Sequence, residues 1–306
     1  MSPYPARTAP ATVVDVVLAR AASGSRPGAR DDAYRVALSI EGGGTRSAYS
    51  AGMAAAVAEA GLLEAFDAVY GTSGGGLNAA WLLTGEGPKW LPSWGWPDVL
   101  AQRVTNPRRL LRGGPLVDTT HLVDHVYSVV TPMDYRAILD NPVSLHPIAT
   151  DAATGKAVDL ARFIRDEAAL RRALRATTAL PLLAGPPVEL GGRLWFDGGL
   201  AEPVPFRTPL SQGVTHLLVL RSRKASDPGR PSRVEGIVLD LYFASRRGPY
   251  RRAPVAAADE VADTAAVQQI WVPEDGHPVA RLSNDGAAIA GAVELGRSTA
   301  HAVLAP

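Results

Sequence analysis

The fold is decided by Val69-Tyr70-Gly71-Thr72-Ser73-Gly74-Gly75, read together with Ile40-Glu41-Gly42-Gly43-Gly44-Thr45-Arg46 upstream. Each stretch follows an apolar run typical of a strand and precedes a small-residue run typical of a helix. The first has the G-x-S-x-G frame, in which a serine occupies a sharp strand-to-helix turn that only small neighbours permit. The second places backbone N–H groups at a helix start, where they can stabilise a developing oxyanion. Together they indicate an acyl-transfer enzyme with Ser73 as nucleophile.

The same order of strand, glycine turn and helix, repeated twice, predicts parallel strands joined by crossover helices. In such sheets, sites form at the carboxyl ends of the strands, where both glycine turns fall. We expect a mostly parallel central sheet in one domain over 34–306, after a helical extension and linker over 1–33. Its last part, 237–306, is expected to be helical around a short strand. The patterns predict helices over 12–22, 46–60, 75–83, 116–130 and 157–176, and strands over 34–40, 66–70, 143–150, 190–196, 214–220 and 270–272.

Composition narrows the function classes. The 306 residues are 46% hydrophobic and 20% charged, as in ordinary globular proteins, and the net charge of +1 gives no reason to expect a nucleic-acid partner. The absence of cysteine excludes disulfides, thiol catalysis and cysteine metal sites. The first eleven residues lack a signal-peptide pattern, and no stretch approaches the roughly 20 apolar residues of a membrane span. We therefore expect a cytoplasmic protein whose membrane contact would be peripheral.

The candidate base for Ser73 is Asp197, which ends an apolar strand and precedes Gly198 and Gly199. Its carboxylate can emerge from this tight turn at the edge of the sheet where Ser73 lies. Of the six histidines, only His277 has a loop setting that suits a general base, so a Ser–His pair remains an alternative. The residues alone also allow ordinary structural roles, with Ser73 as a helix cap and Asp197 as a turn residue.

Other motifs have simpler explanations. His121 and His125 lie four apart on a predicted helix without a third ligand at a suitable spacing, so we expect no metal site. The turn at 42–47 matches neither common phosphate-binding glycine pattern. Asp151 is expected to form a turn rather than to act as a second acid. Arg46 is either a solvated residue at a helix start or, because the helix dipole disfavours a cation there, a group that serves a nearby anion.

The stretch over 84–112 has a different composition and is predicted to be an insertion or cap. Trp90, Trp94 and Trp96 would be either a foot that contacts lipid or packing within this cap, and packing is favoured because no cationic amphipathic helix surrounds them. The arginine-rich runs over 103–112 and 246–252 are interpreted as solvated faces, with attraction to anionic lipid as the alternative.

Five blocks, in order, resemble the patatin-like phospholipase family. Three match its signatures: Gly42-Gly43-Gly44-Thr45-Arg46, Gly71-Thr72-Ser73-Gly74-Gly75 and Asp197-Gly198-Gly199. Ala149-Thr150-Asp151-Ala152-Ala153-Thr154-Gly155 resembles the family's strand-and-turn block, and Leu174-Arg175-Ala176-Thr177-Thr178-Ala179-Leu180-Pro181 resembles its approach to the catalytic aspartate. Five ordered blocks are far more specific than a single G-x-S-x-G frame.

The resemblance spans about 36–220 and implies a three-layer α/β/α fold that carries a Ser–Asp dyad. It implies a lipid acyl hydrolase, phospholipase A or esterase-like, that acts on a lipid or phospholipid without a metal or organic cofactor. The implied roles are nucleophile for Ser73, base for Asp197, oxyanion hole for the N–H groups of Gly43 and Gly44 helped by Arg46, and motif glycines for Gly42, Gly71, Gly75, Gly198 and Gly199. The chain departs from the family at Ser47, where glycine is usual.

A Ser–Asp dyad makes a physical demand. A carboxylate with an ordinary pKa of about 3.9 is a poor base for a serine hydroxyl, and burial in a dry cleft would raise that pKa. The same dyad would also serve an acyltransferase or a thioesterase. A ligand-gated lipid-binding protein with weak hydrolysis is the alternative from another class. Protein partners cannot be inferred from the sequence.

Overall fold

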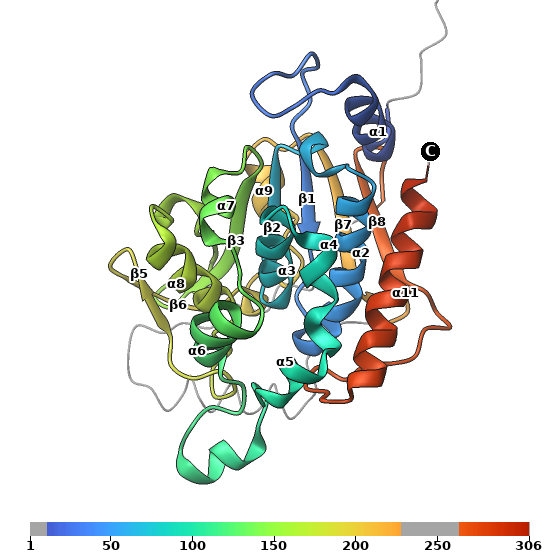
Figure 1. Ribbon diagram of the computed structural model, residues 1–306. Coiled ribbons are helices and arrows are strands. Elements are labelled where there is room, and N and C mark those ends of the chain that lie inside the picture. The colour runs from blue at the N-terminus through green and yellow to red at the C-terminus, as the bar shows by residue number, and fades with distance from the viewer. Residues whose placement is uncertain (1–10, 228–262, 306) are drawn as a thin grey trace, which may run out of the picture.

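An eight-stranded sheet forms the centre of the computed structural model, which describes residues 11–227 and 263–305 (Figure 1). Its strands are β1 (Val36–Ile40), β2 (Ala68–Thr72), β3 (Ser144–Asp151), β4 (Ala157–Asp159), β5 (Val188–Leu190), β6 (Arg193–Asp197), β7 (His216–Lys224) and β8 (Val267–Val272). The strand order is β5-β6-β3-β2-β1-β7-β8, and β4 pairs with β3. The pairs from β3 through β2, β1 and β7 to β8 are parallel, and those of β3 with β4, β3 with β6 and β5 with β6 are antiparallel. The expected mostly parallel sheet is confirmed.

The helices lie mainly on one face of the sheet (Figure 1). The α-helices are α1 (Val13–Ser23), α2 (Ser47–Glu59), α3 (Gly74–Leu83), α4 (Gly87–Trp90), α5 (Pro97–Ala101), α6 (Thr119–His121), α7 (Tyr135–Asp140), α8 (Glu167–Thr177), α9 (Arg207–Ser211) and α11 (Gly286–Leu304). Short 3₁₀ or π turns are η1 (Gly44–Arg46), η2 (Leu63–Ala65), η3 (Leu91–Gly95), η4 (Pro107–Arg112), η5 (Leu122–Val130), η6 (Ala161–Phe163) and η7 (Gly198–Leu200); of these η5 is the π-helix, and it continues α6.

The alternation of side chains along the strands builds two cores. In β1, Val36, Leu38 and Ile40 join the large core formed with α2, α3 and α11, whereas Ala37 faces the opposite side. There it packs in a smaller core with side chains from the 204–214 segment, which includes α9. Strands that are apolar on both faces are typical of a parallel sheet between two helical layers. The three-layer arrangement is therefore present, with outer layers of unequal size in the described part of the chain.

Helix α1 is fixed to this body by a buried cation. The Arg20 guanidinium is 2% exposed and donates to two carboxylates. Asp32 lies shortly before β1, and Asp67 lies directly before β2. Val13 and Val17 of α1 are buried in the large core. A buried charge that is paired on two sides holds its partners firmly in place, because losing either partner would leave the charge uncompensated.

Three sequence-based assignments were wrong in detail. The 157–176 stretch, predicted mostly helical, begins with β4, and α8 starts only at Glu167, where the Asp166 side chain caps Ala169 N at 2.7 Å. The strand predicted over 190–196 is a hairpin of β5 and β6 that turns at Gly191 and Gly192, both of which have positive φ. Strand β7 does not end at 220 but continues to Lys224, because its arginines are neutralised inside the fold. Helix α7 was not predicted. The arginine-rich run over 246–252, which was interpreted as a solvated face, lies outside the described residues.

The tryptophan-rich stretch is packed onto the body rather than built as a separate cap. Trp90 is buried, with its ring centroid 5.9 Å from that of Trp81 on α3. The Nε1–H of Trp94 donates to the amide oxygen of Asn78, also on α3, at 2.9 Å. The ring centroid of Trp96 lies 5.8 Å from that of Trp90, and 37% of Trp96 is exposed. The packing role expected for this segment is confirmed for Trp90 and Trp94.

Helices α2 and α11 lie side by side (Figure 1), and two glycines allow their close approach. A Cβ on Gly52 would collide with the backbone oxygen of Val293, and one on Gly296 would collide with that of Tyr49. By contrast, a Cβ on Gly291 of α11 would meet nothing within 4 Å.

We therefore predict that Gly52→Ala and Gly296→Ala each lower the free energy of unfolding by about 1–3 kcal/mol, because the helices must separate. Gly291→Ala is the matched control and should stabilise by up to about 1 kcal/mol, through helix propensity alone. Urea unfolding of the three variants measures this. Three similar effects would show that close packing is not what requires glycine at the contact.

Candidate active site

Ser73 occupies a strained turn between β2 and α3. Its φ of 55° and ψ of −128° place a non-glycine residue in the left-handed half of backbone space, which costs of order 1–3 kcal/mol. The surrounding structure holds this geometry: the Ser73 N–H donates to Oγ1 of Thr177 at 2.9 Å, and that hydroxyl donates to the Ile148 carbonyl at 2.5 Å. Thr177, the last residue of α8, therefore fixes the backbone of the candidate nucleophile.

Glycines surround this turn because backbones meet there. A Cβ on Gly75 would strike the carbonyl oxygen of Ile40 in β1, and one on Gly42 would lie 2.8 Å from the Thr72 oxygen. Gly71 faces the backbone of Gly75 and Gly76 in the same way. The two glycine-rich turns thus touch each other directly at the carboxyl ends of β1 and β2. No residue with a side chain fits at these three positions without moving the backbone.

The structure brings Asp197 to Ser73. Ser73 Oγ donates to Asp197 Oδ2 at 2.8 Å, across 124 positions of sequence. The other carboxylate oxygen, Oδ1, accepts the Gly199 N–H at 2.7 Å, and the Asp197 N–H donates to the Ala179 carbonyl at 3.0 Å. A Cβ on Gly198 would collide with the Ile148 oxygen. The Asp-Gly-Gly turn therefore both aims the carboxylate and allows β3 to approach.

Burial raises the pKa of Asp197 to about 6, from an ordinary value of 3.8. Hydrogen bonds from Gly199 and Ser73 and the positive charge of Arg281 favour the ionised form, but the loss of solvent outweighs them. The carboxyl group is 4% exposed and has no ion-pair partner among the described residues. Its basicity is thus shifted in the direction that a serine-activating carboxylate needs.

The raised pKa has a consequence for stability. Folded Asp197 binds its proton more tightly than the unfolded chain does, so unfolding releases a proton between the unfolded value and about 6. Stability conferred by the protonated carboxyl is therefore present at low pH and is lost as the pH rises through that window. At neutral pH, ionisation of Asp197 destabilises the fold by up to about 3 kcal/mol.

We predict that Asp197→Asn is more stable than the wild type near neutral pH, and that this difference disappears at about pH 4. Asp151→Asn is the matched control, and it should destabilise because the Asp151 carboxylate is buried, pairs with Arg193 and accepts the N–H groups of Ala153 and Thr154. Thermal unfolding across this pH range measures both. A stability gain that grows as the pH falls would contradict the burial argument.

The turn after β1 presents backbone donors beside this pair. Among the described residues, the N–H groups of Gly43 and Gly44 have no hydrogen-bond acceptor. Gly44 has a φ of 59°, and a Cβ there would collide with the Arg281 carbonyl, which accepts the Thr45 N–H at 2.8 Å. The Arg46 guanidinium lies against Asp227 at 2.9 Å, and burial lowers its pKa. The turn is thus packed tightly while two of its donors stay available.

A buried ionic cluster anchors the start of this turn, and the sequence did not reveal it. The Glu41 carboxylate lies 3.1 Å from Arg221 and 2.9 Å from Arg223, and it accepts the Ser222 N–H at 2.9 Å. All four residues are buried. The Ser222 hydroxyl donates to the Gly42 carbonyl at 2.6 Å. The strand was predicted only to residue 220, and the sequence offered no signal for these arginines other than their position directly after an apolar run.

The end of the same turn is tied to the same segment. Arg223 donates through Nη1 to the Asp227 carbonyl at 3.1 Å, while the Asp227 side chain pairs with Arg46. Residues 41 and 46, at the two ends of the turn, are therefore held by the end of β7 and by the chain that follows it. Ser47, which stands where the family usually has glycine, has a φ of −61°, so this backbone does not need glycine there.

The other candidates lie elsewhere. All six histidines fall within the described residues, and none forms a hydrogen bond with Ser73; His277 is exposed, and its carbonyl accepts the Tyr49 hydroxyl. The rings of His121 and His125 stack 4.9 Å apart. Asp151 forms the turn expected of it, through the contacts with Ala153 and Thr154.

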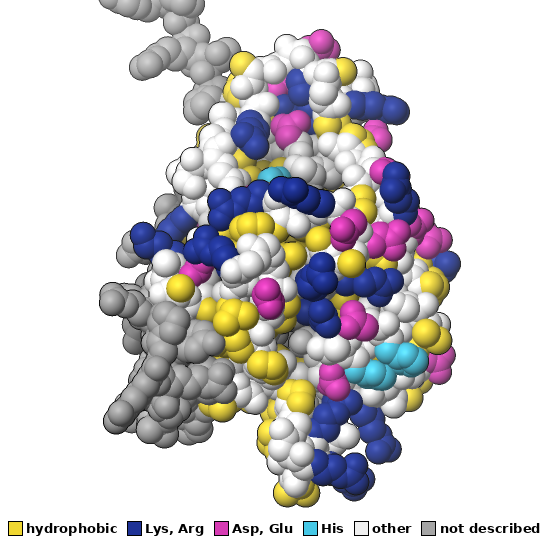
Figure 2. All heavy atoms as spheres, turned by 90° about the vertical axis from the view of Figure 1, so that its left-hand side faces the viewer, with side chains coloured by type: hydrophobic (Ala, Val, Ile, Leu, Met, Phe, Trp, Pro, Cys, Tyr) yellow, Lys and Arg dark blue, Asp and Glu magenta, His cyan; other side chains and the backbone are white. Residues whose placement is uncertain are grey.

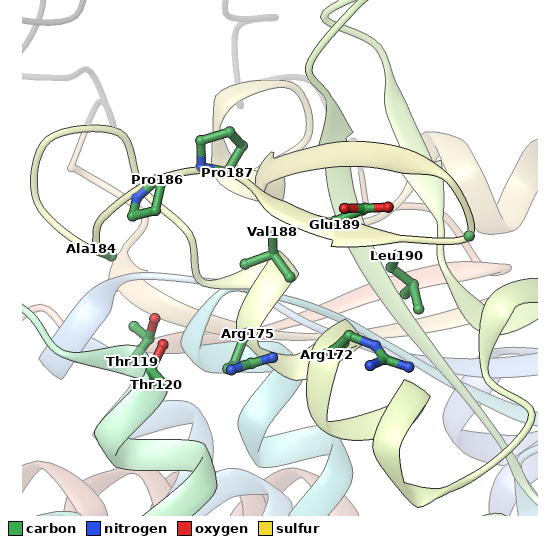
Figure 3. A pocket seen from close by; sticks show the side chains of 11 residues that line it. Thr119, Thr120, Arg172, Arg175, Ala184, Pro186, Pro187, Val188, Glu189 and Leu190 are labelled. Carbon is green, nitrogen blue, oxygen red and sulfur yellow. The ribbon is translucent and has the colours of Figure 1, made fainter.

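A surface cavity of about 600 Å³ lies between α6, α8 and the loop before β5 (Figure 3). Arg172 and Arg175 of α8 lie below it in this view, and Pro186, Pro187 and Val188 lie above. Arg175 is already paired with Asp124 at 2.9 Å. Neither Ser73 nor Asp197 lines this cavity, so it is separate from the Ser–Asp pair, although α8 contributes both its two arginines and the Thr177 that contacts Ser73.

A family model described as patatin-like phospholipase matches residues 38–210, more than half of the chain. The chain belongs to the patatin-like phospholipase family. The matched range contains both glycine turns and the Asp-Gly-Gly turn that meets them. The ordered blocks recognised in the sequence are thus those of the family.

Two curated relatives of this patatin-like chain are uncharacterised proteins. It is 28% identical over 199 residues to the uncharacterised protein YjjU of Escherichia coli, covering 61% of this chain and 52% of that one. It is 30% identical over 197 residues to an uncharacterised NTE family protein of Mycobacterium tuberculosis, covering 64% and 51%. The chain spans about half the length of the curated relatives it matches.

Solved structures similar to this patatin-like chain are more distant. VipD from Legionella pneumophila gives a TM-score of 0.47 at 13% identity, over 89% of this chain and 67% of that one. Human GIVD cytosolic phospholipase A2 gives 0.44 at 16% identity, over 96% and 62%. Across residues 11–227 and 263–305, no helix combines the length and apolar character needed to cross a membrane.

Proposed function

We propose that this protein is a lipid acyl hydrolase that cleaves carboxylic esters through an acyl-Ser73 intermediate. The observation that carries the proposal is the 2.8 Å hydrogen bond from Ser73 Oγ to a buried carboxylate, Asp197, whose pKa is raised to about 6. Membership of the patatin-like phospholipase family supports a lipid as the substrate. Phospholipase A activity or activity on simpler lipid esters fits equally.

In the proposed reaction, Ser73 Oγ attacks the ester carbonyl while its proton passes to Asp197 Oδ2. The carbonyl oxygen becomes an oxyanion that accepts the N–H groups of Gly43 and Gly44. Collapse of this intermediate breaks the ester bond, and the leaving alcohol takes the proton from Asp197. Water then attacks the acyl-enzyme and gives a proton to Asp197. The bond from the acyl carbon to Ser73 Oγ breaks, Oγ takes that proton from Asp197, and the carboxylic acid is released. Arg46, in its ion pair with Asp227, would contribute by holding the end of the oxyanion turn.

Three features support these roles. The strained Ser73 backbone exposes Oγ at the end of β2, as a nucleophile elbow requires. The Gly199 N–H leaves the carboxylate one preferred orientation, with Oδ2 toward the serine. The Glu41 cluster fixes the oxyanion turn before substrate arrives, and preorganised donors supply the largest part of this kind of catalysis.

We predict that the wild type hydrolyses a short-chain chromogenic ester and a mixed phospholipid suspension, and that Ser73→Ala and Asp197→Asn each reduce turnover by at least about 10³-fold. Asp151→Asn is the control, since this equally buried carboxylate is engaged in a turn and should leave the chemistry intact where the protein folds. Turnover that survives Ser73→Ala would overturn the proposal.

The pH profile gives an independent prediction. Asp197 must be ionised to accept the proton, so kcat/KM for the soluble ester should fall as the pH drops through about 6. A profile that instead breaks near the ordinary carboxylate range of about 4 would show that the base is solvated, and would contradict Asp197 as the buried base.

The alternative functions give different products. An acyltransferase would convert an added alcohol acceptor to a new ester at the expense of free acid, and a thioesterase would prefer thioester substrates. A lipid-binding protein with little hydrolysis would bind intact lipid and release no product with either substrate.

A further inference from the structure

An apolar and basic projection stands out on the described surface. The tip loop, residues 103–118, contains η4 and runs from α5 to α6, projecting below the rest of the described chain in Figure 1. Leu111 is 88% exposed and Leu110 is 52% exposed. Arg108 and Arg112, on either side of the leucines, are also exposed. The lowest part of the surface in Figure 2 accordingly shows hydrophobic and basic side chains together.

The tip loop is held in shape by its own hydrogen bonds. The two sides of its base pair at Thr105 and Val117, with the Asn106 N–H donating to the Leu116 carbonyl at 2.8 Å. The Arg109 guanidinium turns inward and donates to the carbonyls of residues 103 and 104, at 2.9 and 2.8 Å. One arginine thus stabilises the loop from within. The two leucines are therefore exposed on a loop whose shape is fixed by its own hydrogen bonds.

The tip loop also lies on the side of the molecule where the carboxyl ends of the strands carry the Ser–Asp pair. The Val117 N–H at its base donates to the Leu183 carbonyl at 2.8 Å, and Leu183 belongs to the loop after α8. Four residues earlier in that loop, the Ala179 carbonyl accepts the Asp197 N–H at 3.0 Å. Strand β1 points toward the same lower side in Figure 1. Further exposed apolar side chains, Leu182 and Leu282, come from segments that flank the pair.

We propose that the tip loop docks this protein onto anionic lipid bilayers, with Leu110 and Leu111 entering the interface and Arg108 and Arg112 contacting acidic headgroups. The proposal rests on the proposed function, because an enzyme that attacks lipid esters needs access to a lipid surface. Two leucines alone give weak insertion, and stable binding needs a second, electrostatic attraction.

Charge is what favours lipid over other occupants. The whole chain has a net charge of only +1, so the arginines of the tip loop are a local concentration rather than part of a generally basic surface. Within the described residues, neither Arg108 nor Arg112 forms an ion pair, so both guanidinium groups are available to an anionic surface. An apolar pair between two free cations complements an acidic bilayer, where tails lie beneath negative headgroups.

The test is flotation of the full chain with vesicles, in a Ser73→Ala background so that hydrolysis cannot change the lipid. The probes are vesicles of phosphatidylcholine alone and vesicles with about one third phosphatidylserine. We expect binding to the anionic vesicles that weakens as the salt concentration rises, because salt screens the attraction between the arginines and the acidic headgroups. Leu110→Ser with Leu111→Ser should weaken that binding more than tenfold. Arg108→Glu with Arg112→Glu should weaken it at least about 25-fold, at about fivefold for each arginine.

Matched controls lie at the opposite edge of the molecule. Val303→Ser alters a side chain that is 45% exposed at the far end of α11, and Arg26→Glu alters one that is 70% exposed in the loop before β1. Both should bind vesicles as the parent does. In an otherwise wild-type chain, the tip-loop variants should retain hydrolysis of the soluble ester, which shows that they fold.

Two results would overturn the proposal without touching the proposed catalysis: no binding to anionic vesicles, or binding that the tip-loop variants share with the parent. Equal binding to neutral and anionic vesicles would overturn the electrostatic part and, with it, the assignment of the arginines. Failure of the soluble-ester assay in the wild type would instead count against the proposed hydrolysis, since that assay does not depend on docking.

Discussion

Two backbone turns touch at the centre of this molecule, and they can do so only because glycine stands at both Gly42 and Gly75. The contact joins the end of β1 to the end of β2. It places the free N–H groups of one turn beside the strained serine of the other. The neighbouring elements secure this contact: α8 supplies the hydroxyl that holds Ser73 N, and the end of β7 supplies the arginines that hold Glu41. A side chain at either glycine would separate the turns, and the arrangement would be lost.

Two buried carboxylates lie near this contact, and they differ in whether a cation neutralises them within the described residues. Glu41 is surrounded by two arginines and a backbone N–H, so its charge is compensated and it serves as an anchor. In the described part of the chain, the Asp197 carboxylate accepts a serine hydroxyl and one backbone N–H, and burial raises its pKa. An acid that is buried without an ion pair destabilises the fold at neutral pH but becomes a better base. Glu41 therefore anchors the turn, whereas Asp197 has the raised pKa that its proposed role as a base requires.

Much of the fold could be predicted from periodicity and turn residues. The alternation from β1 through α3 follows directly from apolar runs separated by glycine, and the predicted elements there are present within a few residues. The errors have a common cause. Strand β4 and the β5–β6 hairpin are short strands at the side of the sheet, paired antiparallel, and their patterns are too brief to distinguish from helix or from one longer strand. The extension of β7 through Arg221 and Arg223 contradicts the usual link between charge and exposure, because their partner lies 180 or more positions away.

The sequence by itself determined what depends on local sterics: which serine can sit on a sharp turn, which positions must be glycine, and which family the chain resembles. These follow from φ/ψ limits and residue size, which act within a few residues. Only the tertiary structure decided how the carboxylate of Asp197 meets Ser73, how far its solvent is removed, and which carboxylates have ion-pair partners. It also decided that Leu110 and Leu111 are displayed rather than packed. The reason is that burial belongs to no single residue: it is set by every segment that packs around a group and excludes water from it.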